Sequence, residues 1–504
     1  MPGSPGPPPP ELLPVLRYLM PRCPTAFLVG GFLRDRLLGR PDGHDLDLSV
    51  AADPRALARD LADEFGGSYV PLNERHSVAR AVLPLPARDT SPWQIDLARL
   101  EESAQVDAGR RDFTLNALLL PLSDWLDDPQ PTILDPVGGL ADLRHGHLRT
   151  VRADAFDADP VRLLRAVRLE AECGLVLDSA TAQLLRGKGP LLDSAGPERA
   201  RDELCRLLVR ADAATWLRRL DDLGLLTVLL PELEPARGCQ QPKGHYWDVF
   251  QHLIETVASL TAVLTPAPPE ETVPALGQDP GLATLDIQLA MSRPLAGGRP
   301  RVVALRLAAL LHDVAKPACR TFEPTGRMRF FGHADLGADL ARSIMQRLHF
   351  GNLECDLVER VVRHHLRPGH LADVQPISDR AIYRFFRDTE PAGVDTLILS
   401  LADHRAARGP LLDPAEYRRH ENAVVHILDR RAEHLRVVAP VRLATGEDVM
   451  HELGISAGRQ VGKVLDELQE AQAAGEVRDR QRALAFIRSF ARPVEQTRAV
   501  SVER

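Results

Sequence analysis

The chain has 504 residues, of which 44% are hydrophobic, and this length predicts three to four domains with several buried cores. The formal net charge of −8 excludes a uniformly basic coat, so any contact with RNA must come from a local patch. The six cysteines are scattered without a C-x-x-C pair, and no apolar run reaches membrane-spanning length. We therefore expect a cytoplasmic protein without a zinc knuckle or a membrane partner.

The first two predicted segments are a tail and a sheet domain. Residues 1–24 open with MPGSPGPPPP, which lacks the basic and apolar regions of a signal peptide and predicts a disordered Pro-rich tail. From 25 to 151, short β-rich runs such as AFLV and LDLSV alternate with helical patterns such as PRALARDLADEF. This alternation predicts a mixed α/β domain with a sheet.

The first candidate site lies early in this domain. The run FLVGGFLRDRLLG predicts a strand, a turn at Gly30 and Gly31, and a short helix that ends at Gly39. Glycines at such a turn let backbone N–H groups approach a triphosphate. Asp45 and Asp47 are two apart on the next strand, so both carboxylates project from one face and are suited to hold Mg²⁺. The alternative is the solvated face of an edge strand.

Further along the domain, the run WQIDLARL predicts another strand that carries Asp96. This residue either supplies a third carboxylate to the same sheet edge or lies on the surface. Only thirteen residues separate it from Arg110, where the run RRDFTLNA begins.

After Asp159 the pattern becomes helical, and residues 152–236 predict an all-α neck or body. Asp159 and Arg162 are three apart at a predicted helix start, so their side chains reach the same side. A carboxylate can accept a hydrogen bond from the exocyclic amine of C or A while a guanidinium donates to ring acceptors, which suits selection of these bases. The alternative is a helix cap with a local ion pair.

The second candidate site lies in a helical segment at 237–430, interrupted by a Pro-rich stretch at 265–300 with loop composition. Imidazoles and carboxylates on successive helices can converge on one or two divalent transition-metal ions and promote phosphoester hydrolysis. The candidate ligands are His252, His312, Asp313, His333, His364, His365 and Asp403. This ordered series of histidines and aspartates resembles the HD phosphohydrolase superfamily. The alternative is a degenerate domain that serves as a spacer or RNA platform, and we expect His245 and His370 to cap helices or fill cores.

The final segment, 431–504, predicts a helical tail. In its run GISAGRQVGKVLDEL, Gly458 and Gly462 could bring backbone amides, Arg459 and Lys463 close to RNA phosphates, or the glycines could punctuate helices.

The motif order carries a family resemblance. The runs VGGFLRDRLLG with DLD, RRDFTLNA, DPVGGLADLRHGHLRTV, DPVRLLRAVRLEAECGL and ERARDELCRLL follow one another over about 180 residues. They resemble the motifs of the class II CCA-adding enzyme and bacterial poly(A) polymerase family, some members of which carry a fused HD domain.

This resemblance implies an α+β protein, with a polymerase-beta-like mixed α/β head followed by all-α neck, HD and tail domains. It assigns Asp45 and Asp47 to catalysis through Mg²⁺. It assigns nucleotide binding to Gly30, Gly31, Arg34, Arg111, Asp112, Asn116, Asp159, Arg162 and Arg165.

Two departures from the family pattern bear on specificity. The family has the motif E-D-x-x-R, and in this chain Ala158 stands at the position of the first acid. The contacts by which that acid orients its neighbours are therefore missing. The short segment after Asp96 resembles the CC-adding subgroup, which lacks a longer flexible segment there.

The predicted function is template-independent addition of nucleotides from CTP, and from ATP in a full CCA-adding enzyme, to the 3′ end of tRNA. The alternatives are a poly(A) polymerase, or mainly an HD phosphohydrolase with a vestigial head. The sequence leaves the oligomeric state open.

Overall fold

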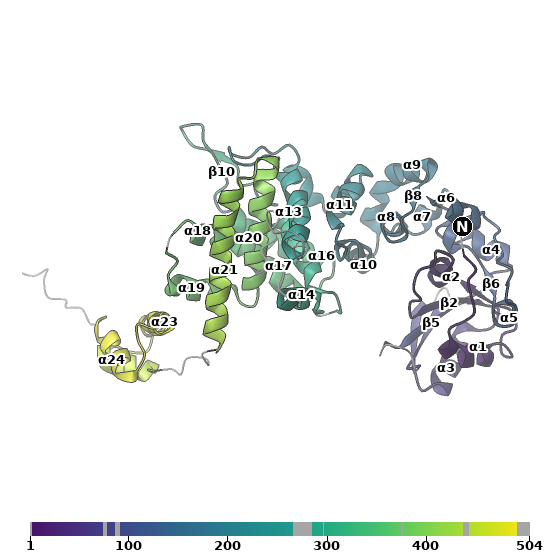
Figure 1. The fold of residues 1–504 in the computed structure, drawn as a ribbon, viewed down its shortest axis with the longest axis horizontal. Helices are drawn as coiled ribbons and strands as arrows, with labels where there is room; N and C mark the ends of the chain where they lie inside the picture. The colour runs from purple at the N-terminus through teal and green to yellow at the C-terminus, as the bar shows by residue number, and fades with distance from the viewer. Residues whose placement is uncertain are drawn as a thin grey trace, which may run out of the picture. The chain divides into compact units, whose positions relative to one another are not determined.

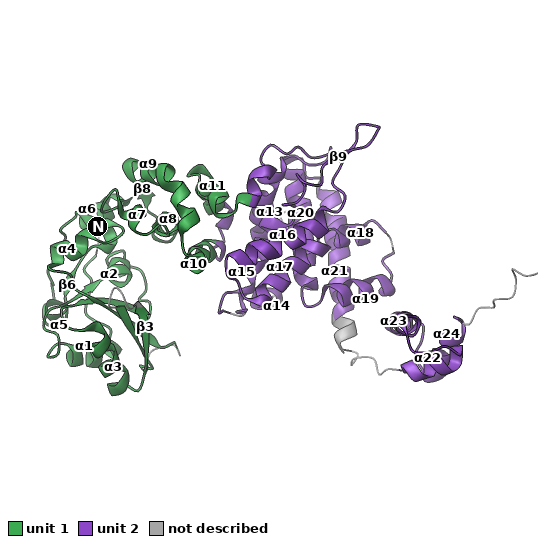
Figure 2. Ribbon diagram, turned by 180° about the vertical axis from the view of Figure 1, so that it is seen from behind, with its two compact units in different colours: residues 1–207, 216–231 green, residues 208–215, 232–504 purple. Residues whose placement is uncertain are grey.

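A computed structural model describes residues 3–73, 78–85, 91–265, 285–295, 297–374, 376–436 and 443–490. The chain divides into two compact units (Figure 2). Unit 1 comprises residues 1–207 and 216–231, and unit 2 comprises residues 208–215 and 232–504. The chain therefore passes from one unit to the other three times.

Unit 1 contains a six-stranded sheet with strand order β3-β4-β5-β2-β1-β6 (Figure 1). Its strands are β1 Ala26–Val29, β2 Asp45–Val50, β3 Ser68–Asn73, β4 Val78–Leu83, β5 Trp93–Arg99 and β6 Leu120–Pro121. The pairing of β2 with β5 is parallel, and the other pairings are antiparallel. Because alternate residues of β4 and β5 are buried, each strand presents one face to the core and the other to the site.

The helices of the sheet domain pack around these strands. They are η1 Pro10–Leu12, α1 Leu13–Leu19, α2 Gly30–Leu37, α3 Pro54–Glu64, α4 Ala104–Gly109, η2 Thr114–Asn116, α5 Leu122–Asp127 and α6 Gly139–His145. The amphipathic helix α3 begins after Asp53, whose carboxylate accepts a hydrogen bond from the backbone N–H of Arg55, and it buries Leu57 and Leu61.

The predicted disorder of residues 1–24 is wrong for residues 10–19. They form η1 and α1 and bury Leu12, Val15, Leu16 and Leu19 almost completely. The indole N–H of Trp125 also donates to the carbonyl of Gly6 at 2.9 Å. The Pro-rich composition hid the apolar spacing of LLPVL, which buries enough surface to hold this segment on the domain.

The second part of unit 1 is helical apart from one short ladder of β7 His147–Leu148 with β8 Val176–Leu177. Its helices are α7 Ala155–Ala158, α8 Arg162–Cys173, α9 Ser179–Lys188, η3 Gly189–Ser194, α10 Pro197–Leu208, α11 Ala213–Asp222 and α12 Leu226–Leu229. Helix α8 ends at Gly174, whose φ of +66° suits glycine and closes the helix.

The larger segment of unit 2 starts within η4 Pro231–Ala236, and its described residues form a large group of helices and a hairpin of β9 Thr321–Phe322 and β10 Met328–Arg329. The helices are α13 Val249–Leu264, α14 Leu285–Ser292, α15 Arg301–Leu311, α16 His333–Arg347, α17 Asn352–His364, α18 Arg367–Ala372, α19 Asp379–Thr389, α20 Gly393–Arg408, η5 Gly409–Leu411 and α21 Pro414–Arg436. Helices α13 and α15 bury residues on several faces, as expected for helices at the centre of a bundle. Of the predicted 265–300 insertion, residues 266–284 and 296 lie outside the described residues, whereas 285–292 form α14.

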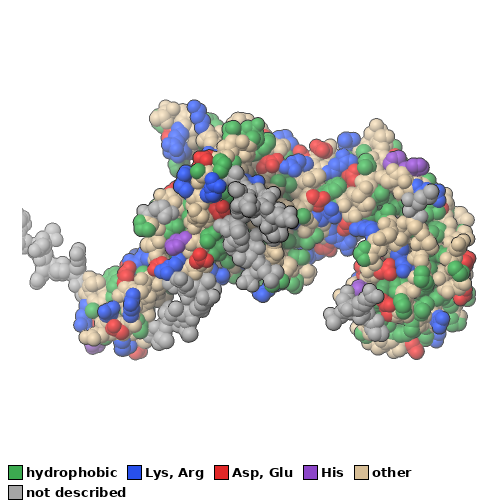
Figure 3. Space-filling view, viewed as in Figure 1, with side chains coloured by type: hydrophobic (Ala, Val, Ile, Leu, Met, Phe, Trp, Pro, Cys, Tyr) green, Lys and Arg blue, Asp and Glu red, His purple; other side chains and the backbone are tan. Residues whose placement is uncertain are grey.

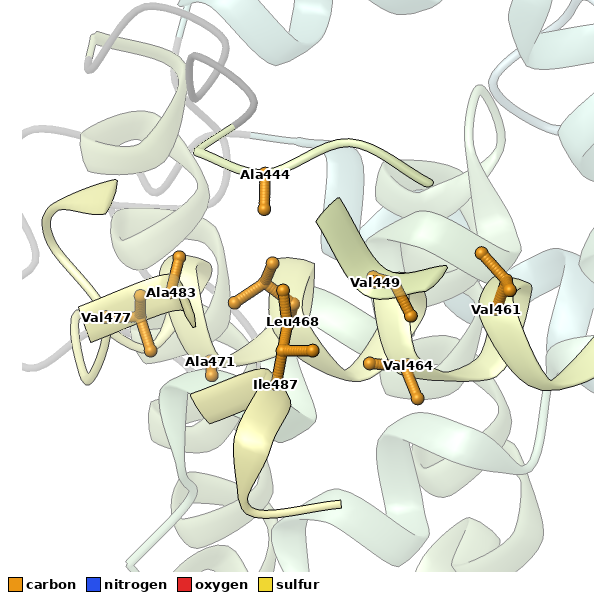
Figure 4. Packing of buried hydrophobic residues seen from close by; sticks show 9 residues of the cluster. All are labelled: Ala444, Val449, Val461, Val464, Leu468, Ala471, Val477, Ala483 and Ile487. Carbon is orange, nitrogen blue, oxygen red and sulfur yellow. The ribbon is translucent and has the colours of Figure 1, made fainter. Parts of the chain in front are cut away.

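The end of unit 2 has an apolar core of its own (Figure 4). Helices α22 Gly446–Leu453, α23 Arg459–Ala473 and α24 Arg480–Arg488 surround Val449, Leu468 and Ile487. Gly458 immediately precedes α23, which favours its interpretation as helix punctuation. The predicted helical tail is therefore a small packed subdomain from residue 443 to 490.

The predicted fold class is confirmed: a mixed sheet with helices is followed by a mostly helical body. Among the described residues, no helix has both the length and the apolar composition of a membrane span. On the face drawn in Figure 3, basic and acidic side chains are interspersed, in keeping with the modest net charge.

Candidate active site and candidate metal centre

The turn between β1 and α2 packs directly against the carboxylate of Asp47. Gly30 has a φ of +72°, and a Cβ at this position would lie 2.5 Å from Asp47 Oδ2. The backbone N–H of Gly31 donates a hydrogen bond to the same oxygen at 3.3 Å. Both glycines of the predicted turn therefore bring backbone against one of the two predicted metal-binding carboxylates.

Three carboxylates gather at this edge of the sheet. Asp45 and Asp47 lie on β2, and Asp96 is the register partner of Asp47 on the parallel strand β5. All three line one cavity of about 560 Å³ together with Gly30 and Gly31. Burial and the neighbouring charge of Asp96 raise the pKa of Asp47 to about 6. The repulsion between neighbouring carboxylates fits the binding of a divalent cation at this edge of the sheet, although the oxygens of the three do not all lie within 4.8 Å of one another.

Arg80 is a site residue that the sequence did not reveal. It is the register partner of Asp96 on β4, and its Nε and Nη2 atoms donate to the two Asp96 oxygens at 2.6 and 2.8 Å. It also lines the cavity of the three carboxylates. The alternating pattern of VARAVL places it on the less buried face of β4, but the pairing with β5 could not be predicted from that pattern.

Four of the predicted nucleotide-binding residues form one hydrogen-bonded chain. Arg34 donates through Nη1 to the Asn116 side-chain oxygen at 2.9 Å, and the Asn116 amide donates to Asp112 Oδ1 at 3.0 Å. Arg165 donates to Asp112 Oδ2 at 3.1 Å. All four residues line the cavity of the three carboxylates. The network fixes side chains from the sheet domain and from α8 in one arrangement.

The charges of this network are balanced by Glu203 on α10. Its carboxylate accepts from Arg165 at 3.1 Å and also from Arg168. Burial would raise the pKa of Asp112, but Arg165 and the hydrogen bond from Asn116 outweigh it and lower that pKa. The motif ERARDELCRLL thus contributes an acid that holds two arginines at the cavity, a role that the sequence did not reveal.

Arg111 also lines this cavity, but its guanidinium is hydrogen-bonded to residues of the sheet domain. It donates to Asp107 at 2.8 and 3.0 Å and to Ser49 at 2.9 Å. These bonds tie the segment that follows α4 to strand β2.

Asp159 and Arg162 line a different cavity, of about 750 Å³, and not the one around the three carboxylates. Asp159 directly follows α7 and Arg162 begins α8, with 3.9 Å between Asp159 Oδ2 and Arg162 Nε. Arg199 on α10 donates to both Asp159 oxygens, at 3.0 and 2.6 Å. Ala158 lies in the same cavity, so the missing acid of the family motif leaves Asp159 held by Arg199.

The second candidate site lies among five helices of unit 2. His252 is on α13, His312 and Asp313 follow α15, His333 begins α16, His365 follows α17, and Asp403 is on α20. Their ligand atoms form two groups, and within each group these atoms lie within 4.8 Å of one another. The residues of the first group, His252, His312 and Asp403, fit a cation. Their two imidazole nitrogens and one carboxylate oxygen lie 3.0–3.6 Å from one another.

His364 is the one predicted ligand that the structure does not bring to this centre. It is partly buried and belongs to neither ligand group among the described residues. Successive positions on a helix point about 100° apart, because an α-helix has about 3.6 residues per turn, so His364 and His365 cannot both face the centre.

A cavity of about 270 Å³ opens beside the candidate metal centre. It is lined by His365 and Asp403 from the two ligand groups, and by Arg408 and Ser400. His245 and His370, which were expected to cap helices or fill cores, also line it, as do His404 and His420. The sequence pattern gave no reason to single out the last two, because they become neighbours only through the packing of α20 against α21.

Three family models match the chain. They are "Poly A polymerase head domain" at residues 26–149, "Probable RNA and SrmB- binding site of polymerase A" at 174–237, and "HD domain" at 282–408. These matches follow the order of the predicted head, helical neck and HD segments.

Two curated relatives are similar over almost their full length. The A-adding tRNA nucleotidyltransferase of Deinococcus radiodurans is 34% identical over 94% of this chain and 97% of its own length. The CC-adding tRNA nucleotidyltransferase of Thermus thermophilus is also 34% identical, over 92% of this chain and 93% of its own. A solved structure of the Thermotoga maritima CCA-adding enzyme complexed with tRNA shares the fold, with a TM-score of 0.59, 18% identity and 96% coverage of both chains. On the strength of these full-length relationships, the chain belongs to the class II tRNA nucleotidyltransferase family.

Proposed function

We propose that the head of this chain transfers nucleotides from CTP or ATP to the 3′ end of tRNA and releases pyrophosphate. The observation that carries the proposal is the set of three carboxylates, Asp45, Asp47 and Asp96, in one cavity with the Gly30–Gly31 turn. Three carboxylates that repel one another beside a glycine turn are suited to a triphosphate with its cations.

In this proposal Asp45 and Asp47 hold Mg²⁺, which neutralises charge on the triphosphate when bound. The 3′-hydroxyl oxygen of the RNA loses its proton to solvent and forms a bond to the α-phosphorus, while the bond from that phosphorus to the pyrophosphate oxygen breaks. Backbone N–H groups of the Gly30–Gly31 turn approach the phosphates, and Arg80 is placed to balance their charge. The chain of Arg34, Asn116, Asp112 and Arg165 orients the ribose, because each of its side chains is already fixed by a neighbour.

Base selection is assigned to Asp159 and Arg162. A carboxylate acceptor beside a guanidinium donor matches the Watson–Crick edge of C or A. In the described structure Arg199 occupies both oxygens of Asp159, so one of these bonds must be given up when a base binds. Helices of the 174–237 segment then supply phosphate contacts to tRNA, recognised by shape and backbone.

The nucleotide added is tested with two tRNA ends. The purified chain is incubated with tRNA that ends at the discriminator base, or with tRNA that ends in CC, and with CTP alone, ATP alone or both, and the 3′ ends are sequenced. The short segment between Asp96 and Arg110 favours CC addition, which predicts two cytidines on the first tRNA and no product on the second.

Other products would change the assignment. A single A on the second tRNA alone would identify an A-adding enzyme like the relative from Deinococcus radiodurans. A long A run would support a poly(A) polymerase and contradict the proposal. The Asp45→Ala/Asp47→Ala double variant should lose addition by at least about 10³-fold, since several kcal/mol of cation-dependent stabilisation is removed.

A second proposed function, metal-dependent phosphoester hydrolysis, is favoured by the centre in unit 2. Buried imidazoles and carboxylates converge there beside an open cavity. The test is hydrolysis of a chromogenic phosphate ester by the Asp45→Ala/Asp47→Ala variant in Mn²⁺, which should persist in that variant and be lost in His312→Ala. A chain without any hydrolysis would have an HD domain that acts only as a platform.

A further inference from the structure

We propose that the β9–β10 hairpin of unit 2, with the residues that flank it, binds single-stranded RNA. We call residues 320–331 the hairpin surface. This inference goes beyond the proposed function, in which the RNA contacts come from the 174–237 segment, and it requires no hydrolysis in unit 2. Its basis is two exposed aromatic rings, the arginines beside them, and a backbone that is already fixed.

Two phenylalanines of the hairpin surface lie open to solvent. Phe322 on β9 is 63% exposed, and Phe331, two residues after β10, is 74% exposed. They are the only phenylalanines among the exposed large hydrophobic side chains of the part of the chain that the structure describes. A ring left in water forgoes the stabilisation that burial provides, and neighbouring rings of this kind mark a contact surface.

Arginines accompany these rings. The hairpin surface carries Arg320, Arg327 and Arg329 against a single acid, Glu323, so three positive charges and one negative charge leave +2 in a chain of net charge −8. Arg329 donates through Nε to Glu323 at 2.8 Å, and its guanidinium carbon lies 5.8 Å from the ring centroid of Phe331. Basic side chains gather where this hairpin projects from unit 2 (Figures 1 and 3). Positive charge and aromatic rings are therefore adjacent.

The backbone of the hairpin is held in one conformation. Strands β9 and β10 pair antiparallel, and the N–H of Glu323 donates to the carbonyl of Arg327 at 2.9 Å. The N–H of Gly326 donates to the carbonyl of Glu323 at 2.8 Å, and Gly326 has a φ of +77°, which suits glycine. Because the loop is already ordered, little conformational entropy is lost when a ligand binds.

The exposed rings are not part of the packing that holds the hairpin on unit 2. That contact is made by Phe330, which is partly buried and whose ring centroid lies 5.6 Å from Lys316 Nζ. The carbonyl oxygen of Phe330 also lies 2.6 Å from His333 Nδ1 at the start of α16. Substitution of Phe322 and Phe331 should therefore leave the fold intact.

Single-stranded RNA is the ligand whose chemistry matches this surface. An unpaired base stacks on an exposed aromatic ring, whereas a base inside a duplex is covered by its neighbours. Arginines beside the rings are placed for the phosphates that link successive bases. The net positive charge of the hairpin surface favours a polyanion over a protein with a purely apolar face, and the ends and loops of tRNA contain such single strands.

The first test locates the contact. The full chain is irradiated with a single-stranded RNA of about 12 nucleotides that contains 4-thiouridine, without nucleotide or divalent cation, and the crosslinked peptides are identified by mass spectrometry. We expect crosslinks within residues 320–331. Crosslinks confined to other segments would overturn the proposal.

The second test measures the contribution of the two rings. In a fluorescence anisotropy titration with the same RNA, Phe322→Ser/Phe331→Ser should lower the affinity by at least about tenfold, since stacking of each base adds to binding. The matched control is Leu353→Ser/Leu411→Ser, because these side chains are 63% and 73% exposed elsewhere in unit 2. The control should bind as the wild type does, and equal affinities in the two variants would contradict the proposal.

The third test concerns phosphate contacts. Arg327→Ala should reduce the slope of the logarithm of affinity against the logarithm of salt concentration by about 0.7, the value expected for one phosphate of a single strand. Arg418→Ala, an exposed arginine on α21, is the control and should leave the slope unchanged. An unchanged slope in Arg327→Ala would remove this arginine from the RNA contact and contradict the proposed role of charge.

Two further outcomes separate this inference from its alternatives. Asp45→Ala/Asp47→Ala should lose nucleotide addition and keep its affinity for the single-stranded RNA, so failure of the proposed function is distinguished from failure of the hairpin surface. Sedimentation of the wild type and of Phe322→Ser/Phe331→Ser tests for a protein contact. Self-association that this variant abolishes, with RNA affinity unchanged, would assign the surface to a second copy of the chain and overturn the proposal.

Discussion

The carboxylate of Asp47 lies directly against the backbone of Gly30, so each residue restricts the side chains that the other position can carry. A side chain at Gly30 would have to displace Asp47 Oδ2, and the backbone there has a φ that other residues avoid. Similar mutual limits hold for Asp112 with Arg165 and for Asp159 with Arg199. At the scale of single residues, the proposed function of the head can therefore be tested by substitutions in these contacting pairs.

Gly30→Ala should reduce nucleotide addition by about 10²-fold in kcat/KM, since displacement of a positioned group by about 1 Å costs that much. The control is Gly39→Ala. Gly39 has a similar φ of +69°, but a Cβ there would meet nothing within 4 Å. Gly39→Ala should therefore share the backbone cost and keep most of the activity. Equal losses in both variants would mean that strain, and not contact with Asp47, makes Gly30 necessary.

Asp112→Asn should lower the free energy of unfolding of unit 1 by about 1–3 kcal/mol at pH 7, because Arg165 loses a buried partner. The pKa of Asp112 is lowered in the folded state, so its contribution is present above the unfolded value of about 3.9 and is lost as the pH falls through the folded pKa. The difference between wild type and variant should thus shrink below about pH 4. Urea unfolding followed by tryptophan fluorescence at several pH values measures this, and a difference independent of pH would contradict the ion pair.

Arg199→Ala should reduce nucleotide selectivity by roughly tenfold, which is the order of discrimination that one bidentate contact supplies. Ala158 cannot orient Asp159, so Arg199 is the group that holds both its oxygens. Competing CTP, ATP, UTP and GTP in one reaction gives the misincorporated fraction. Arg186→Ala on α9, an exposed arginine outside this cavity, is the control. An unchanged fraction in Arg199→Ala would show that Asp159 is held by other means.

At the scale of elements, the sequence pattern predicted the features that depend only on residues close together in the chain. The alternation of DLDLSV correctly placed Asp45 and Asp47 on one face, and the glycines of the β1–α2 turn were recognised by their spacing. Partners set by sheet register or helix packing were not predictable in this way, as Arg80 and Glu203 show. Asp96 is an intermediate case, because its strand was predicted but its pairing with Asp47 was not.

The helical segments show the same limit. The spacing of the histidines predicted a shared centre, yet only helix geometry separates His365 from His364. The apolar side chains of α1 were overlooked because prolines dominate the composition around them. One sequence supplies spacing along a helix, whereas its rotation about its own axis is set by the neighbours against which it packs.

Leu468→Ala on α23 should destabilise the subdomain at 443–490 by about 2–5 kcal/mol, since this side chain is 1% exposed at the centre of its core. Hydrogen exchange across residues 443–490 should accelerate accordingly. Glu467→Ala, on the exposed side of the same helix, is the control and should leave exchange close to wild type. Equal protection in both variants would mean that the core contributes little to local stability.

At the scale of the whole molecule, the proposed function requires an acidic chain to bind an acidic ligand. With a net charge of −8, long-range attraction to tRNA is weak, and affinity must come from arginines near the phosphates. On the face drawn in Figure 3, basic and acidic side chains are interspersed, so this face offers local basic sites for phosphates and no continuous basic surface.

The affinity for tRNA should consequently fall by about 10- to 100-fold between 50 and 200 mM salt, the range expected for release of about two to four counterions. A filter-binding or fluorescence titration at several salt concentrations gives the slope. A much steeper slope would indicate a broad basic face, and a flat one would exclude phosphate contacts as the main source of affinity.

The three passages of the chain between its units limit how the protein can be divided. The segment 208–215 belongs to unit 2, where Arg306 donates to the carbonyl of Leu208, while the later segment 216–231 belongs to unit 1. A fragment cut at 207 loses helices that complete the first unit, and one cut at 231 carries away a piece of the second. Neither unit can be released by a single proteolytic cleavage, and a gene encoding either unit alone would have to restore the exchanged segment.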